Sequence, residues 1–144
     1  MKLKDVKDFA RNHGQSRIFT EWTDSEVLRH LELHRKNKTL LVAEEDGEIS
    51  GFLIFRRIED FNGDVTPHFW KPSEPYGKNV YVHELCSKCR NATNVLLHGF
   101  EAVNSDSEKV NYWAHRKNIL KKYSYKDFRR LMIWENQNHQ KNQI

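Results

Sequence analysis

Three side chains with metal-binding chemistry follow one another near the middle of the chain. His83, Cys86 and Cys89 are three residues apart, a spacing that zinc ligands tolerate, and His98 or His115 offers a fourth ligand. Strand alternation, however, places Cys86 on the face opposite His83, and the chain has a single C-x-x-C. We therefore expect no metal site, and we expect both thiols to act as small apolar side chains.

The same Cys86-x-x-Cys89 pair has the spacing of a redox motif at a strand–helix junction. A thioredoxin-like chain places this motif near its start and follows it with a cis-proline. Here the motif lies far from the start, and the last proline is Pro75. We therefore do not expect redox chemistry.

The stretch 80–103 that carries these residues predicts a strand running directly into a helix. Val80, Val82 and Leu85 favour a strand, and helical apolar spacing begins at Ala92. A helix N-terminus directs several free backbone N–H groups at one point. The junction is therefore a candidate site for an anion such as phosphate.

Positive charge is concentrated in the segment 109–135. It holds eight basic and two acidic residues, a net charge of +6 in a chain whose total is +4. Four aromatic residues that could stack on bases are interleaved with it. This pattern is compatible with an anionic ligand, nucleic acid or an acidic protein. The aromatic residues are Tyr112, Trp113, Tyr123 and Tyr125.

Composition limits the class of protein. A chain of 144 residues with 38% hydrophobic and 31% charged residues suits one globular domain. No apolar run approaches the length of a membrane span, and the N-terminus has no signal-peptide core. We expect no membrane partner, and a cytoplasmic, reducing compartment in which the two cysteines stay free.

The N-terminal third predicts two helices and a hairpin. Residues 2–12 fit an amphipathic helix, residues 17–22 a linker or short extended piece, and a second helix runs to about Asn37. Thr23 and Glu26 have the spacing of a capping box that begins the second helix.

The hairpin has a clear turn signal. Strands are expected at 39–44 and 49–58, joined by Asp46-Gly47, a pair that tolerates a type I′ turn. Gly51 is a candidate for a bulge in the second strand.

The remaining segments complete a mixed sheet. Residues 59–78, with all three prolines, predict a long loop that is either a lid or a packed surface loop. We expect a strand at 109–114, a short basic helix or turn at 118–125 and a last strand at 129–135. The fold class is thus α/β (an α+β mixed sheet) in the order α-α-β-β-β-α-β-(α)-β, with a domain at 1–135 and a polar tail at 136–144 that is disordered unless a partner holds it.

This element order resembles the Gcn5-related N-acetyltransferase (GNAT) superfamily. In that family the strand–helix junction that corresponds to residues 80–103 binds the pyrophosphate of acetyl-CoA. A splay between two strands holds the pantetheine arm. The resemblance implies an acyl-CoA cofactor beside Leu85 and Cys86. Its phosphates would meet a turn in which Asn91 and Thr93 replace the family's two glycines, and the residues of that turn would be Lys88, Arg90, Asn91 and Thr93.

The resemblance also implies catalytic roles. Glu84 falls where many members place a general base for the amine acceptor. Asn118 and Tyr125 keep the family's seven-residue spacing, which implies that Tyr125 protonates the departing thiolate and that Asn118 contacts the cofactor.

Two smaller groups share the loss of the turn glycines. The toxin-activating lysine acyltransferases resemble GNAT domains and take their acyl chain from acyl carrier protein; here His13, His30 or His34, with Glu84, would fill their catalytic roles. The chain is also similar to small degenerate GNAT-like proteins of bacteriophages.

Three functions follow as hypotheses. The first is a GNAT-like N-acyltransferase that moves an acyl group from acetyl-CoA or another acyl-CoA to an amine on a protein or small molecule. The second is an inactive GNAT-like module that binds a protein or assembles a viral particle, with the C-terminal tail as a contact, in the host cytoplasm or virion. The third is a basic nucleic-acid-binding module.

Overall fold

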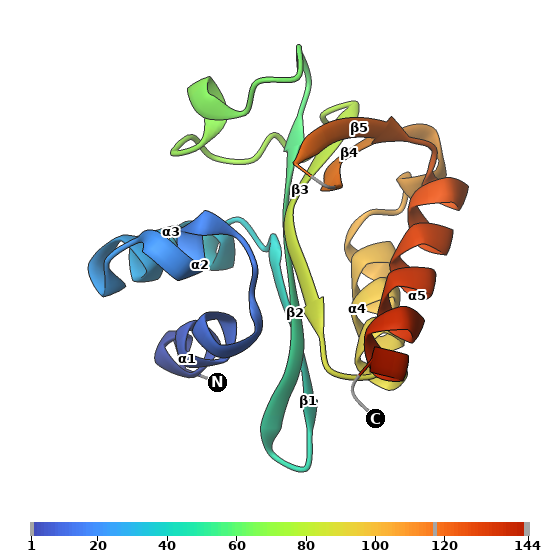
Figure 1. Ribbon diagram of the computed structural model, residues 1–144. Coiled ribbons are helices and arrows are strands. Elements are labelled where there is room, and N and C mark those ends of the chain that lie inside the picture. Colours follow the sequence, from blue (N-terminus) through green and yellow to red (C-terminus); the bar gives the residue numbers. More distant parts are fainter. Residues whose placement is uncertain (1, 117, 143–144) are drawn as a thin grey trace.

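The chain folds into a five-stranded mixed sheet with helices on both faces, which confirms the expected α/β class (Figure 1). The computed structural model describes residues 2–116 and 118–142, with side chains as far as residue 133. The strands lie in chain order from β1 to β5. Helices α1, α2 and α3 cover one face, and α4 and α5 cover the other.

The first helical layer consists of α1 (Leu3–His13), α2 (Arg17–Glu21) and α3 (Asp24–Lys36). The expected capping box at the start of α3 is confirmed. The Thr23 hydroxyl accepts from the Glu26 N–H at 3.2 Å, and the Glu26 carboxylate accepts from the Thr23 N–H at 3.2 Å. Two orphan donors of the first turn are thereby satisfied.

The expectation of a linker or extended piece at 17–22 is wrong, because this segment forms α2. The Ser16 side chain accepts from the Ile18 N–H at 3.3 Å and begins the helix. The turn also buries Ile18 and Phe19 in the core, and this burial compensates for the shortness of the helix.

The hairpin of β1 (Leu40–Glu45) and β2 (Glu48–Ile58) is confirmed. Its two turn residues have positive φ, 53° at Asp46 and 80° at Gly47, as a type I′ turn requires. The bulge in β2 falls on Ser50. Gly51 pairs with Ala43 and Ile49 pairs with Glu44, so Ser50 has no partner residue on β1.

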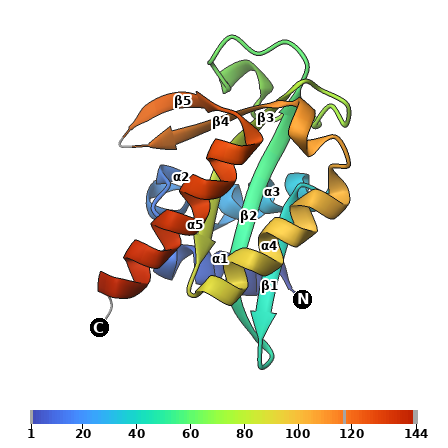
Figure 2. The ribbon, with the colours of Figure 1, turned by 90° about the vertical axis from the view of Figure 1, so that its right-hand side faces the viewer.

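The sheet divides where β3 (Asn79–Ser87) meets β4 (Asn111–Arg116). The two strands are parallel, and their pairing ends after three residues, at Tyr81 and Trp113. Beyond this point β3 pairs only with β2, while β4 pairs with the antiparallel β5 (Ile119–Tyr123). The β4–β5 hairpin therefore curves away from the first three strands toward the α4–α5 side (Figures 1 and 2).

Two expectations for the C-terminal part are wrong. Residues 118–125 form β5 rather than a short helix or turn, because Asn118 takes a positive φ of 65° and turns the chain back on β4. Residues 129–135 belong to α5 (Tyr125–Asn142) rather than to a strand. The helix crosses the expected boundary between 135 and 136, and residues 143–144 lie outside the described residues.

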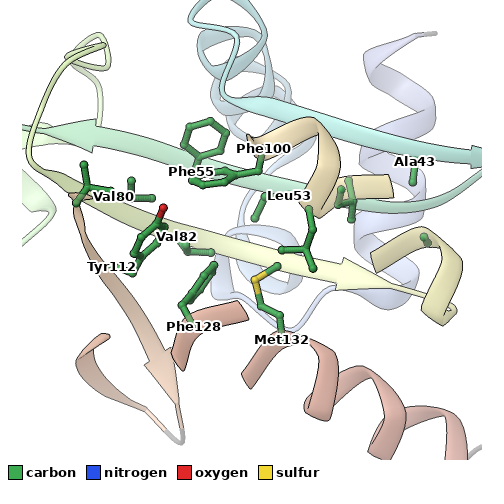
Figure 3. Packing of buried hydrophobic residues seen from close by; sticks show 13 residues of the cluster. Ala43, Leu53, Phe55, Val80, Val82, Phe100, Tyr112, Phe128 and Met132 are labelled. Atoms are coloured by element: carbon green, nitrogen blue, oxygen red, sulfur yellow. The ribbon is translucent and has the colours of Figure 1, made fainter. Parts of the chain in front are cut away.

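Helix α5 lies beside α4 (Arg90–Val103) on the same face of the sheet (Figure 2). Phe128 and Met132, four residues apart on one side of α5, are buried against Val82 of β3 and Tyr112 of β4 (Figure 3). This periodicity of four is helical, and it explains why the segment is not a strand.

Candidate functional site

A β-bulge determines which side chains of β3 face the first helical layer. Ile54 of β2 pairs with Glu84 and the next residue pairs with Val82, so His83 is the extra residue. His83 and Glu84 therefore point to the same face, toward α1–α3. Leu85 then returns to the α4 side.

Glu84 lies under the loop between α1 and α2. Its Oε1 accepts from the Gln15 N–H at 2.7 Å and the Ser16 N–H at 3.4 Å. Its Oε2 is buried and has no hydrogen-bond partner among the described residues. Burial raises the pKa of this carboxyl group, although the two backbone N–H groups act in the opposite direction. Glu84 is thus a carboxylate with one oxygen held and one oxygen available for a proton.

Tyr125 lies on the other side of the sheet. At the start of α5, its hydroxyl donates to Oε1 of Glu101 on α4, and its ring lies near Tyr112 with centroids 5.3 Å apart. Burial and the Glu101 carboxylate raise the pKa of Tyr125. The structure therefore does not bring Tyr125 together with Glu84, which contacts the α1–α2 loop on the opposite face.

Protein groups occupy part of the N-terminus of α4. The Cys89 sulfur accepts from the Ala92 N–H at 3.4 Å as the helix cap. Thr93, at a position that the resemblance aligns with a glycine, is 1% exposed, and its hydroxyl pairs with the Ser87 hydroxyl at 2.6 Å. The turn is consequently packed where the family pattern has only backbone.

A carboxylate lies at the same helix end. Glu45, the last residue of β1, accepts from Asn91 Nδ2 at 2.9 Å and lies 3.6 Å from the Cys89 sulfur. A negative side chain is favourable beside a helix N-terminus, and it repels a second anion there. The residues at this turn therefore do not fit a pyrophosphate group.

The basic residues assigned to the cofactor do not converge on this turn. Lys88 Nζ lies over the Phe9 ring of α1, 5.5 Å from its centroid. Arg90 begins α4 and is exposed. Asn118 lies in the turn between β4 and β5, a connection that is separated from α4 by the whole of β4. Of the predicted cofactor set, only Leu85 and Cys86 line β3 beyond the point where β4 leaves it.

The zinc and redox alternatives also fail on geometry. Cys86 packs toward α1 and donates to the His13 carbonyl at 3.4 Å, whereas Cys89 caps α4. The argument that Cys86 and His83 lie on opposite faces is wrong, because the bulge at His83 restores them to one face. Even so, within the described residues no three His, Cys, Asp or Glu side chains are grouped to hold a metal ion. Burial raises the pKa of the Cys86 thiol to about 12, so it is not a nucleophile.

The long loop at 59–78 is anchored by two buried arginines, which sequence reasoning did not identify. Arg56 of β2 donates to the carbonyls of His68, Phe69 and Lys71, with 2.6 Å to Phe69 and 3.1 Å to Lys71. Its Nε donates to Nε2 of His83 at 2.9 Å. The guanidinium is satisfied by four acceptors, although burial lowers its pKa to about 10.

Arg57 holds the other end of the loop. It donates to the Gly77 carbonyl at 2.8 and 2.5 Å and binds both carboxylate oxygens of Asp106 at 2.9 and 2.8 Å. The Ser73 hydroxyl accepts from the Arg57 N–H at 2.8 Å. The two arginines thus fix a segment that has only one short 3₁₀ turn, Thr66–His68, of its own.

The anchored loop presents aromatic side chains to solvent. Trp70 is 40% exposed and Tyr76 is 90% exposed. Trp70 stacks on Trp22, with ring centroids 5.9 Å apart, and the Arg29 guanidinium lies 4.2 Å from its centroid. Below it, Phe69 is stacked on His30 with centroids 5.1 Å apart. We call Trp22, Phe69 and Trp70, whose rings contact one another, the aromatic surface, and Tyr76 is a further exposed ring on the same loop.

A cluster of three histidines lies directly beneath this surface. His30 and His34 of α3 and His83 of β3 have ring centroids 4.6 to 5.2 Å apart. Sequence reasoning cast His30 and His34 only as catalytic candidates. The helical spacing could have predicted that both side chains are buried. Val27, His30, Leu31 and His34 lie on one face of α3, the face that is buried.

The basic segment does not present its aromatic residues for stacking. Tyr112 is fully buried, and Trp113 donates to Asn79 Oδ1 at 2.9 Å and lies beneath Lys122. Tyr123 and Tyr125 are packed against the core. The exposed lysines of β5 and α5 therefore lie beside aromatic rings that are at most partly exposed.

Across the described ranges, none of the helices combines the length and apolar character that crossing a membrane requires. A scan against protein-family models and a search of the curated proteins found no match to this chain.

Proposed function

We propose that this chain is a GNAT-like module that has exchanged acyl-CoA chemistry for protein binding through its aromatic surface. The observation that carries the proposal is the anchored loop at 59–78. Arg56 and Arg57 hold the loop in one conformation, and it exposes Trp70 and Tyr76. Exposed aromatic side chains on a preorganised backbone are typical anchors of protein interfaces, because little conformational entropy is lost when they bind.

The α4 N-terminus supports the loss of cofactor binding. Glu45 supplies a negative charge where pyrophosphate would lie, and Thr93 and the Cys89 cap fill the turn. The two residues assigned to catalysis, Glu84 and Tyr125, contact opposite faces of the sheet. A module with these features has no arrangement for holding acetyl-CoA and protonating its thiolate.

Photo-crosslinking tests the binding proposal. A benzophenone amino acid at position 76 is expected to crosslink a protein in the cells that make this chain, and Trp70→Ser is expected to abolish the product. The matched control is the same probe at Val95, which is 45% exposed in the first half of α4, at the helix end opposite to the one that Arg57 contacts through Asn104. Equal crosslinking at the two positions, or persistence of the product in the Trp70→Ser chain, rejects the aromatic surface as the interface.

A second candidate is a GNAT-like N-acyltransferase, favoured by the unpartnered Oε2 of Glu84. A buried carboxyl with a raised pKa, on the strand that β4 leaves, is suited to accept a proton from an amine acceptor. Acyl-CoA, when bound, would supply the reactive thioester. Nothing in the α4 turn fits the pyrophosphate of that cofactor, so we assign Glu84 only the proton-accepting role.

Calorimetry separates the two candidates. The binding module predicts no heat with acetyl-CoA at millimolar concentration. The acyltransferase predicts binding, amine-dependent release of free thiol, and a loss of about a hundredfold or more in rate on Glu84→Gln. Glu44→Gln, an exposed acid on β1, is the matched control. Binding together with Glu84-dependent turnover would replace the first proposal by the second.

A further inference from the structure

The three-histidine cluster has an unusual lack of hydrogen-bond partners. His30 is fully buried, and neither of its ring nitrogens has a partner among the described residues. His34 is 1% exposed; its Nδ1 pairs with the Thr39 hydroxyl at 2.7 Å, while its Nε2 is buried without a partner. Buried polar atoms left unpaired are costly, so the closed cluster opposes the packing around it.

The charges around the cluster are all of one sign. Arg56 of β2 donates to His83, and His115 of β4 reaches the cluster through the Tyr81 hydroxyl, 3.1 Å from its Nε2. The loop contributes the neutral rings of Phe69 and Trp70. Within the described part of the chain, no carboxylate acts on the pKa of any of the three histidines.

Protonation of the closed cluster is therefore strongly disfavoured. Burial, with a smaller contribution from Arg56, lowers the pKa of His30 to about 3. Burial, followed by His30 and Arg56, lowers the pKa of His34 to about 2, although a backbone hydrogen bond to Phe55 acts in the opposite direction. The pKa of His83 is likewise well below its ordinary value, for the same reasons. A proton can be accepted readily only when water and room are admitted.

The loop is the removable wall of this site. Phe69 and Trp70 cover His30 from the loop side, and Arg56 attaches both the loop and His83 to β2. The larger hydrophobic cluster, between the sheet and the α4–α5 layer, contains no residue of the loop, whereas the cluster on the α1–α3 side has Phe69 of the loop packed against it. Release of the loop would thus uncover His30 and His83, remove Phe69 from the edge of the second cluster and leave the larger core in place.

We propose that protonation of the three-histidine cluster releases the 59–78 loop from the sheet at mildly acidic pH, while the rest of the fold stays intact. The cluster would act as a pH-sensitive latch. This role depends on the contacts of the histidines with the loop and with Arg56, and not on whether the loop binds a partner. Because the histidines are neutral when the loop is closed and protonate when it opens, acid favours the open form. Each proton taken up multiplies the open-to-closed ratio by up to about tenfold per pH unit below the ordinary histidine pKa.

Hydrogen exchange of the full chain tests the latch. Between about pH 7.5 and about pH 4.5, after correction for intrinsic exchange, amides of residues 66–72 are expected to lose protection while β1 and α4 keep theirs. Far-UV circular dichroism is expected to be unchanged over the same range. His30→Phe, which keeps an aromatic ring beside Phe69, is expected to reduce this loss of protection at least tenfold.

Two controls keep the result decisive. His98→Gln removes an exposed histidine on α4 and is expected to behave as the original chain. His83→Gln, which keeps an acceptor for Arg56, is a second cluster variant for use if His30→Phe does not fold. The latch is rejected if loop protection is the same at both pH values, if a folded cluster variant opens like the original chain, or if circular dichroism is lost in the same step as loop protection.

Discussion

Arg56 Nε donates to His83 Nε2 at 2.9 Å, and this contact connects the long loop to the bulge in β3. The same guanidinium holds three loop carbonyls, so one side chain sets both the covering of the histidine cluster and the position of His83. Because His83 is the bulged residue, its fixed position also helps to turn Glu84 toward the α1–α2 loop. Loop, histidine cluster and buried carboxylate therefore form one connected unit.

Replacement of Arg56 by methionine is expected to lower the free energy of unfolding by about 2–4 kcal/mol, because the loop carbonyls and His83 Nε2 lose their donor. Urea titration followed by circular dichroism measures the change. The matched control is Arg35→Met, which removes an exposed arginine from a surface pair with Glu32. That control is expected to leave the unfolding midpoint unchanged within experimental error, because an exposed ion pair contributes little. Equal effects of the two changes would show that Arg56 is not the anchor.

Truncation of Phe128 to alanine is expected to destabilise the fold by about 3–5 kcal/mol, because it removes a buried ring that packs on Tyr112 and leaves a cavity. The Phe128 ring is stacked on that of Tyr112 with centroids 5.0 Å apart. Ile119→Ala on β5 is the control, since Ile119 is 59% exposed, and it is expected to change stability by about 0.5 kcal/mol or less. A cost below about 1 kcal/mol for Phe128→Ala would contradict the docking of α5 on the sheet.

Thr23→Ala is expected to cost about 1 kcal/mol, because the Glu26 N–H loses its acceptor at the start of α3. Chemical denaturation of the variant provides the measurement. Ser25→Ala, an exposed change in the same helical turn, is the control and is expected to be close to neutral. Were both substitutions equally costly, the loss at Thr23 would not be specific to the cap, because alanine favours the helix at position 25.

The sequence predicted the elements whose signals are local. The capping box at Thr23 and the turn at Asp46-Gly47 depend on residues a few positions apart, and both lie where they were expected. The parallel pairing of β3 and β4 was also predictable, because a strand–helix–strand order constrains it.

The errors arise where tertiary contacts decide. Residues 129–135 have strand-like composition, but burial of Phe128 and Met132 at helical spacing favours α5. The bulge at His83 could not be read from alternation, and it changed the face of Glu84 and with it the candidate site. The sequence analysis assigned no role to Arg56 and Arg57, because only the loop folded over them makes them buried anchors.

Glu84→Gln is expected to stabilise the chain at neutral pH. The pKa of Glu84 is raised in the folded state, mainly by burial, so the folded protein holds this proton more tightly than the unfolded chain does. Stability is therefore lost as pH rises from the ordinary glutamate pKa through the raised one, and no such loss affects glutamine. Glutamine can still accept from the Gln15 N–H through its amide oxygen.

Thermal unfolding at about pH 4 and about pH 7.5 is expected to show a higher midpoint for the variant only at the higher pH. Glu44→Gln, at an exposed position of β1, is the control and is expected to show no such pH-dependent gain. A variant less stable than the original chain at neutral pH would mean that the ionised carboxylate has a stabilising partner, and would exclude Glu84 as a strained proton acceptor.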